Sequence, residues 1–128
     1  MTNKELYSAT LRLLGETNDT AYTGDYEERF PYLLALFCGE AEELDDKYRM
    51  ANKMPRALYR MRAVADMDAE FPLSDPFASA AIYYCAAMLV SDENPEFSDK
   101  LFDKYTERLA NVYAALPWEL GKIRNIYD

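Results

Sequence analysis

The longest uninterrupted apolar stretch of the chain predicts a buried central helix. Every residue from Ala80 to Val90 is apolar or aromatic, so a helix here would be apolar around most of its circumference and must be buried on several sides. Asp75 can cap its start, and Pro76 suits the first helical position. The pattern therefore places this helix at the centre of a small helical bundle.

A short amphipathic helix is predicted at the start of the chain. Apolar residues recur at three- and four-residue steps from Thr2 to Gly15. The next residues, 16–24, are rich in Thr, Asn and Asp and show no periodicity, which is typical of a loop.

The second predicted helix contains a proline. It opens at Asp25 and keeps a periodic apolar face until about residues 46–48. Pro31 lacks the backbone N–H that a helix interior needs. Because the apolar pattern is uninterrupted after this proline, we expect the helix either to begin near Arg29 or to bend at Pro31.

The last long helix is predicted to pack antiparallel to the central helix. Asn94 and Pro95 repeat the pattern of a cap followed by proline, and only residues 91–93 connect the two helices. The last helix stops at Pro117. The segment 117–128 is too apolar for an idle tail, so we expect it to dock on the bundle or on another chain. Its candidate contact residues are Trp118 and Tyr127.

Together these elements predict an all-α fold. We expect a single domain, residues 1–128, built as a small bundle of about four helices. An extended basic segment, about residues 48–73, lies between the second and third long helices. With 128 residues, half of them hydrophobic, the chain can form a sizeable core without disulfides or metals.

The charge pattern reverses sign near residue 47. Acidic residues cluster from Glu40 to Asp46, whereas six basic residues and no acidic one lie between Lys47 and Ala65. The cations can pair within the subunit with the preceding acids, meet an acidic surface on another subunit or partner, or contact DNA. The alternation of apolar and basic residues over 57–64 predicts an extended conformation there. The candidate interface residues are Glu40, Glu43, Asp46, Arg56, Arg60 and Arg62.

The composition argues against the common kinds of catalytic site. The chain has no His, which excludes Ser-His and Cys-His nucleophiles and His-rich metal sites. It also lacks a glycine-rich phosphate loop, a Cys-x-x-Cys pair and the Asp-rich loop of a calcium site. Cys38 and Cys85 lie within apolar patterns, where cysteine acts as a small hydrophobe. We therefore predict no catalytic residue, no cofactor, no metal ion and no small-molecule substrate.

The net charge and the N-terminal residues predict where in the cell the protein is found. A net charge of -9 argues against non-specific binding to nucleic acid or to an anionic membrane. The first residues lack the basic region and apolar run of a signal peptide, and the longest apolar run is shorter than a membrane span. We expect a soluble protein made in a cytoplasm.

The central hairpin carries a family resemblance. A Phe71-Pro72-Leu73 triplet precedes the alanine- and tyrosine-rich stretch 80–89, an acidic turn containing a proline follows at residues 92–96, and Phe102 and Tyr105 stand in the last helix. In this order, residues 71–113 resemble the small helical head-tail connector (adaptor) proteins of tailed bacteriophages and prophages.

The resemblance implies a structural function. It implies a mostly helical protein that forms a ring beneath the portal, joins the DNA-filled head to the tail, and belongs to the virion. The implied partners are other copies of the chain, the portal and tail-completion proteins, with passive contact to DNA in transit and no membrane. A ring needs two different patches on each subunit, and the charge reversal suits this. The alternatives are a cytoplasmic helical interaction module without catalytic activity, such as a regulator or an assembly chaperone, and a carboxylate-dependent enzyme.

Overall fold

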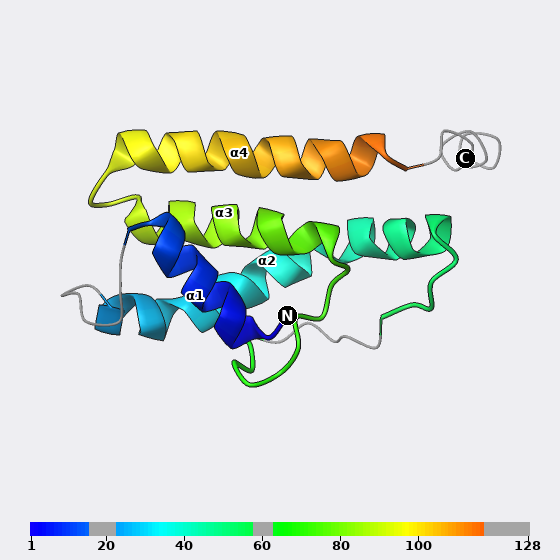
Figure 1. Cartoon of the computed structure of the whole chain (residues 1–128), viewed down its shortest axis with the longest axis horizontal. Coiled ribbons are helices and arrows are strands. Elements are labelled where there is room, and N and C mark those ends of the chain that lie inside the picture. Colours follow the sequence, from blue (N-terminus) through cyan, green and yellow to red (C-terminus); the bar gives the residue numbers. More distant parts are fainter. Residues whose placement is uncertain (16–22, 58–62, 117–128) are drawn as a thin grey trace.

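The computed structural model describes residues 1–15, 23–57 and 63–116. These residues form four helices (Figure 1): α1 (Asn3–Leu13), α2 (Thr23–Ala51), α3 (Pro76–Val90) and α4 (Pro95–Ala114). No strand occurs among the described residues, where Thr2 and Glu70 form only an isolated antiparallel bridge. The prediction of a small all-α bundle is confirmed.

Helix α3 is the centre of the bundle. Figure 1 shows α3 between α4 on one side and α1 and α2 on the other, and α3 contacts all three. Its alanines allow α4 to approach closely, since Ala86 and Ala87 are fully buried and Ser98 Oγ of α4 donates to the Ala87 carbonyl at 2.9 Å. The predicted central helix is therefore confirmed, with α4 as its antiparallel neighbour.

Three of the predicted start signals are correct and one is wrong. Pro76 and Pro95 each lie in the first turn of a helix, and the Asn94 side chain accepts a hydrogen bond from the Phe97 N–H. Asp75, in contrast, has helical backbone angles and makes no side-chain cap bond. The turn already begins one residue earlier, because the Phe77 N–H bonds to the Ser74 carbonyl.

Helix α2 begins at Thr23, close to the predicted opening at Asp25, and continues through Pro31. Of the two alternatives at the proline, a start near Arg29 is therefore wrong. The turns before the proline are held in the core, where Tyr26 and Phe30 are 2% and 1% exposed. The Phe30 ring also packs on Tyr7 of α1, with centroids 5.0 Å apart. Burial of two large aromatic side chains outweighs the roughly 3 kcal/mol that an interior proline costs a helix.

Helix α2 also ends later than predicted, at Ala51 rather than near residues 46–48. The Met54 N–H bonds to the Arg49 carbonyl and the Lys53 N–H to the Met50 carbonyl. This pair of bonds is a Schellman end, and Lys53 occupies its left-handed position with φ of +56°. The first part of the predicted extended segment is therefore helical.

The second part of that segment runs beside the start of the chain. The N–H groups of Asn3 and Lys4 donate to the carbonyls of Ala69 and Met67, and the Phe71 N–H donates to the Met1 carbonyl. The N-terminal ammonium lies 3.0 Å from the Glu70 carboxylate. These bonds hold residues 67–71 beside the start of the chain.

The two cysteines are buried. Cys38 of α2 and Cys85 of α3 are 2% and 0% exposed, in keeping with their predicted role as small hydrophobes. Burial also raises the pKa of Cys85 well above its usual value.

Among the described residues, no helix combines the length and apolar character that crossing a membrane requires.

Candidate interaction surface

Helix α2 buries one face and exposes the opposite one. The buried face contains large side chains such as Phe30, Leu34 and Phe37. On the opposite face, the exposed fractions of Tyr32, Leu36 and Met50 are 57%, 49% and 64%. We call this face the outer stripe of α2; its residues are Tyr32, Leu36, Glu40, Glu43 and Met50, all of them exposed.

The two predicted acidic residues of the outer stripe remain open to solvent. Glu43 lies 3.7 Å from Lys47, one turn along the helix, and its side chain is 85% exposed. Glu40 forms no ion pair within the described part of the chain. Burial, together with a smaller effect of the Glu40 charge, raises the pKa of Tyr84 to about 12 and also raises the pKa of Tyr105.

The acidic cluster and the basic segment meet at one predicted pair. The Arg56 guanidinium lies 3.4 Å from the Asp46 carboxylate, at the surface, where such a pair contributes at most about 1 kcal/mol. Of the three alternatives for the basic residues, pairing with the preceding acids within the subunit is therefore found for Arg56. The predicted residues Arg60, Arg62, Trp118 and Tyr127 lie outside the described residues.

A buried ion pair lies beside these surface groups, and sequence reasoning missed it. Asp45 is fully buried; one of its oxygens accepts from Arg49 Nε and the other from the Ser74 N–H, both at 2.9 Å. The other two nitrogens of the Arg49 guanidinium, Nη1 and Nη2, donate to the carbonyls of Pro55 and Pro72 at 3.3 Å.

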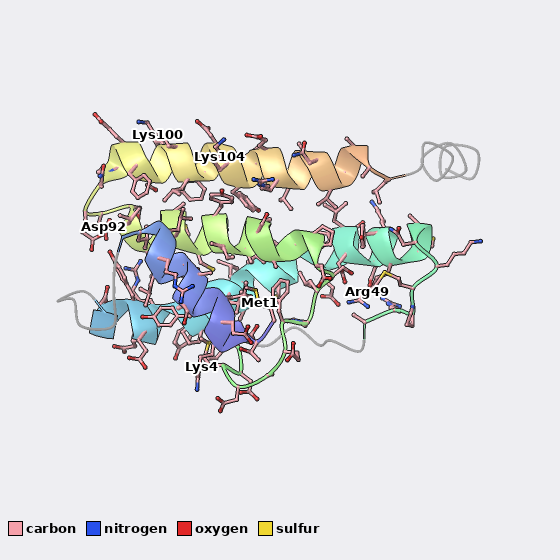
Figure 2. All side chains as sticks on the ribbon, viewed as in Figure 1. Met1, Lys4, Arg49, Asp92, Lys100 and Lys104 are labelled. Carbon is pink, nitrogen blue, oxygen red and sulfur yellow. The ribbon has the colours of Figure 1, made fainter. Side chains whose placement is uncertain are left out.

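Arg49 and Asp45, which we call the clamp, therefore join both ends of the basic segment to α2. Figure 2 shows Arg49 beside the C-terminal end of α2, where the chain turns away from the helix. The spacing of Leu34, Cys38, Ala41 and Asp45 was the available signal, since it places the aspartate on the apolar face of the helix.

A surface groove opens next to the clamp. Its volume is about 410 Å³, and it is lined by Asp46, Arg49, Met50, Met54 and Arg56. Met50 and Met54 are both exposed, at 64% and 39%, and the Arg56 side chain is 82% exposed. The C-terminal end of α2 thus offers apolar surface next to positive charge.

The acidic residues do not form a metal site in the described part of the chain, where no three His, Cys, Asp or Glu side chains lie close enough to hold an ion. Comparisons with protein-family models, with curated proteins and with solved structures found no match. The chemistry of the outer stripe, the clamp and the groove is therefore the basis for assigning a function.

Proposed function

We propose that this chain is a structural head-tail connector of a tailed bacteriophage or prophage, which assembles with copies of itself into a ring between portal and tail. The observation that carries the proposal is the separation of charge along α2. Glu40 and Glu43 are exposed in the middle of the helix, whereas the clamp holds the basic segment at the helix end through Pro55 and Pro72.

This separation leaves two different charged surfaces on one subunit. Among the described residues, two surface ion pairs join the acidic cluster to the basic run, Glu43 with Lys47 and Asp46 with Arg56. The exposed acids and the rest of the basic segment are available to two different neighbours, which is the requirement of a head-to-tail interface. Opposite charges at such an interface fix the register and suppress wrong contacts.

The resemblance of residues 71–113 to head-tail connectors supports the same function. Those residues form α3, α4 and the turn that joins them, so they supply the scaffold rather than the contacts. A net charge of -9 also suits a ring through which DNA must pass without being gripped.

The experiment is electron microscopy of the concentrated full-length chain, alone and with portal protein. Rings are expected for the unaltered chain. The double variant Arg60→Glu, Arg62→Glu should form none, while its helical circular dichroism and melting temperature stay unchanged. The matched control is Lys100→Glu, Lys104→Glu, which reverses two cations on the outer side of α4 (Figure 2). Rings that persist in the Arg60, Arg62 variant would refute this contact.

A second candidate function is a helical interaction module that works without forming a ring. The exposed apolar side chains of Tyr32, Leu36 and Met50 favour it, because they offer a docking face that needs no ring. This candidate predicts a monomer or a dimer under every condition, including in the presence of portal protein.

A further inference from the structure

The groove at the end of α2 presents two flexible apolar side chains. Met50 and Met54 are 64% and 39% exposed and line it together with Arg56. Its volume of about 410 Å³ lies within the range of about 300–1,000 Å³ that is typical of ligand sites. Methionine side chains adapt their shape to a partner and make favourable contacts with aromatic rings. The groove therefore suits an occupant with large apolar side chains.

Arg56 gives the groove a preference for negative charge. Its side chain is 82% exposed, and its Nη2 atom lies 3.4 Å from the Asp46 carboxylate. A guanidinium has five N–H donors, so this contact leaves donors for a second carboxylate. The other arginine of the groove, Arg49, pairs with the buried Asp45. The occupant that fits is thus an acid flanked by large apolar residues.

The chain itself contains such a sequence. Glu119 lies between Trp118 and Leu120, and we call these three residues the tail motif. No other acid of the chain has a leucine, isoleucine, methionine or aromatic residue on both sides. The apolar character of segment 117–128 predicts that it docks on the bundle or on another chain, and the groove supplies the complementary chemistry.

The groove of the same subunit lies out of reach of the tail motif. The Phe37 ring of α2 faces α4, with its centroid 6.1 Å from that of Tyr105. At about 100° per residue, Asp46 of the groove lies on the opposite side of α2 from Phe37, and Figure 2 shows α4 and Arg49 on opposite sides of the end of α2. Trp118 stands two residues beyond the last described residue, a span of at most about 7 Å. A helix with its side chains is about 10–12 Å wide, so the motif must come from another copy.

We propose that the tail motif of one copy of this chain binds in the groove of a second copy. Glu119 pairs with Arg56 there, and its two apolar neighbours pack on the methionines. Each subunit then offers one tail motif and one groove, which are two different patches, so the contact is head-to-tail and can close into a ring. The inference rests on the proposed function, because the head-to-tail arrangement is that of the ring. In that ring, α2 receives both the basic segment and the tail motif of its neighbour.

The fluorescence of the unaltered full chain tests the contact, because the chain has a single tryptophan. Between about 1 µM and about 300 µM, a range that brackets the affinity of a small interface, the emission of Trp118 should move to shorter wavelength as its indole leaves water for the methionines. A motif bound in its own groove would not respond to concentration. Emission that stays constant over this range would therefore overturn the proposal.

A charge swap tests the pairing of Glu119 with Arg56. Arg56→Glu and Glu119→Arg should each move the midpoint of the shift to a concentration at least about tenfold higher, because like charges then face each other. The double variant should regain the original midpoint. The matched control Lys53→Glu makes the same change at an exposed residue outside the groove lining and should behave as the unaltered chain. An Arg56→Glu chain with the original midpoint, or a double variant that does not recover, would refute the proposal.

Cysteine cross-linking shows which groove is occupied and leaves the contact residues intact. A chain carrying Lys53→Cys and Gly121→Cys, treated with a short bismaleimide, should give a ladder of dimer, trimer and larger products, because each subunit both donates and receives a motif. The native Cys38 and Cys85 are buried and give no background. A cross-link confined within one chain, or products that stop at the dimer, would contradict the head-to-tail contact.

The failure of this contact and the failure of the proposed function give different results. Fluorescence and cross-linking use the isolated chain, whereas the connector function is tested by rings in the presence of portal protein. Rings formed by the Arg56→Glu chain, together with an unchanged fluorescence midpoint, would overturn the contact and leave the connector function standing. A cross-linked ladder without rings, even with portal protein, would support the contact and overturn the connector function.

Discussion

Removing the carboxylate of Asp45 should destabilise the protein more than any other single change to the acidic cluster. The side chain is fully buried and accepts two hydrogen bonds at 2.9 Å, from Arg49 and from the backbone of Ser74. In Asp45→Ala, the guanidinium of Arg49, whose side chain is only 16% exposed, is left without its counter-charge. Breaking a buried pair in this way costs about 3–5 kcal/mol.

The size of the loss in the free energy of unfolding distinguishes a buried ion pair from a surface ion pair. Asp45→Asn keeps the shape and an oxygen for the Ser74 N–H but loses the charge, so we expect a cost of about 2 kcal/mol. Asp46→Ala is the matched control, because the neighbouring acid meets Arg56 at the surface and its removal should cost less than about 1 kcal/mol.

Urea denaturation followed by circular dichroism measures these differences. With a urea slope of about 1–3 kcal/mol per M for small proteins, the loss of about 3–5 kcal/mol in Asp45→Ala should lower the urea midpoint by about 1–5 M. Limited trypsin digestion adds a local readout. Once Pro55 and Pro72 are no longer held, cleavage after Lys53 and Arg56 should become faster. Equal stability of Asp45→Ala and Asp46→Ala would refute the role assigned to the clamp.

Three further changes probe other parts of the fold. Lys53→Gly should stabilise the protein by about 0.5–1 kcal/mol in urea denaturation, since Lys53 holds a left-handed φ of +56° at the end of α2; a loss of stability would contradict the assigned helix end. Ala87→Leu should lower the melting temperature sharply by overpacking the contact between α3 and α4, where Ala87 is fully buried, whereas Ala110→Leu on the exposed side of α4 should not. Stability should also fall at alkaline pH. Burial raises the pKa of Cys85 above its usual 9.0, so the unfolded chain loses this proton first, and the stability present below pH 9.0 is lost as pH rises further, by about 1.4 kcal/mol per pH unit. Cys85→Ala should delay this loss until the buried tyrosines begin to contribute, and an identical pH profile would refute it.

The helices themselves were predictable because their signals are local. The apolar run of 80–90 and the cap-then-proline pattern at Asn94 and Pro95 act within a few residues. The structure accordingly has α3, α4 and the tight turn between them where the sequence predicts them. Amphipathic periodicity likewise indicated α1.

The ends of α2 were not predictable from local signals. Proline disfavours a helix interior wherever it occurs, so the sequence left a start near Arg29 open beside the opening at Asp25. The tertiary burial of Tyr26 and Phe30 decides for the earlier start. The missing side-chain cap at Asp75 has a similar origin. The start of α3 is held by the bond between the Ser74 N–H and Asp45, which lies 29 residues earlier.

The acidic character of the candidate surface was predictable, but which of its acids is buried was not. Exposed positions were expected for Glu40 and Glu43, and the structure has both exposed. Asp45 stands between acids of the same kind, and nothing in a count of charges distinguishes it from them. Its position on the apolar face of α2 separates it, because a buried carboxylate requires a paired cation.

The basic run from Lys47 to Arg62 therefore consists of groups with different roles. Lys47 and Arg49 belong to α2, and Arg49 donates to Asp45 and to the carbonyls of Pro55 and Pro72. Arg56 meets Asp46. A partner that binds positive charge therefore has fewer of these cations available than the sequence contains, and the ring contact that we propose would use Arg60 and Arg62. Charge reversal there should then change assembly without changing stability, whereas Arg49→Met should lower stability in every assembly state.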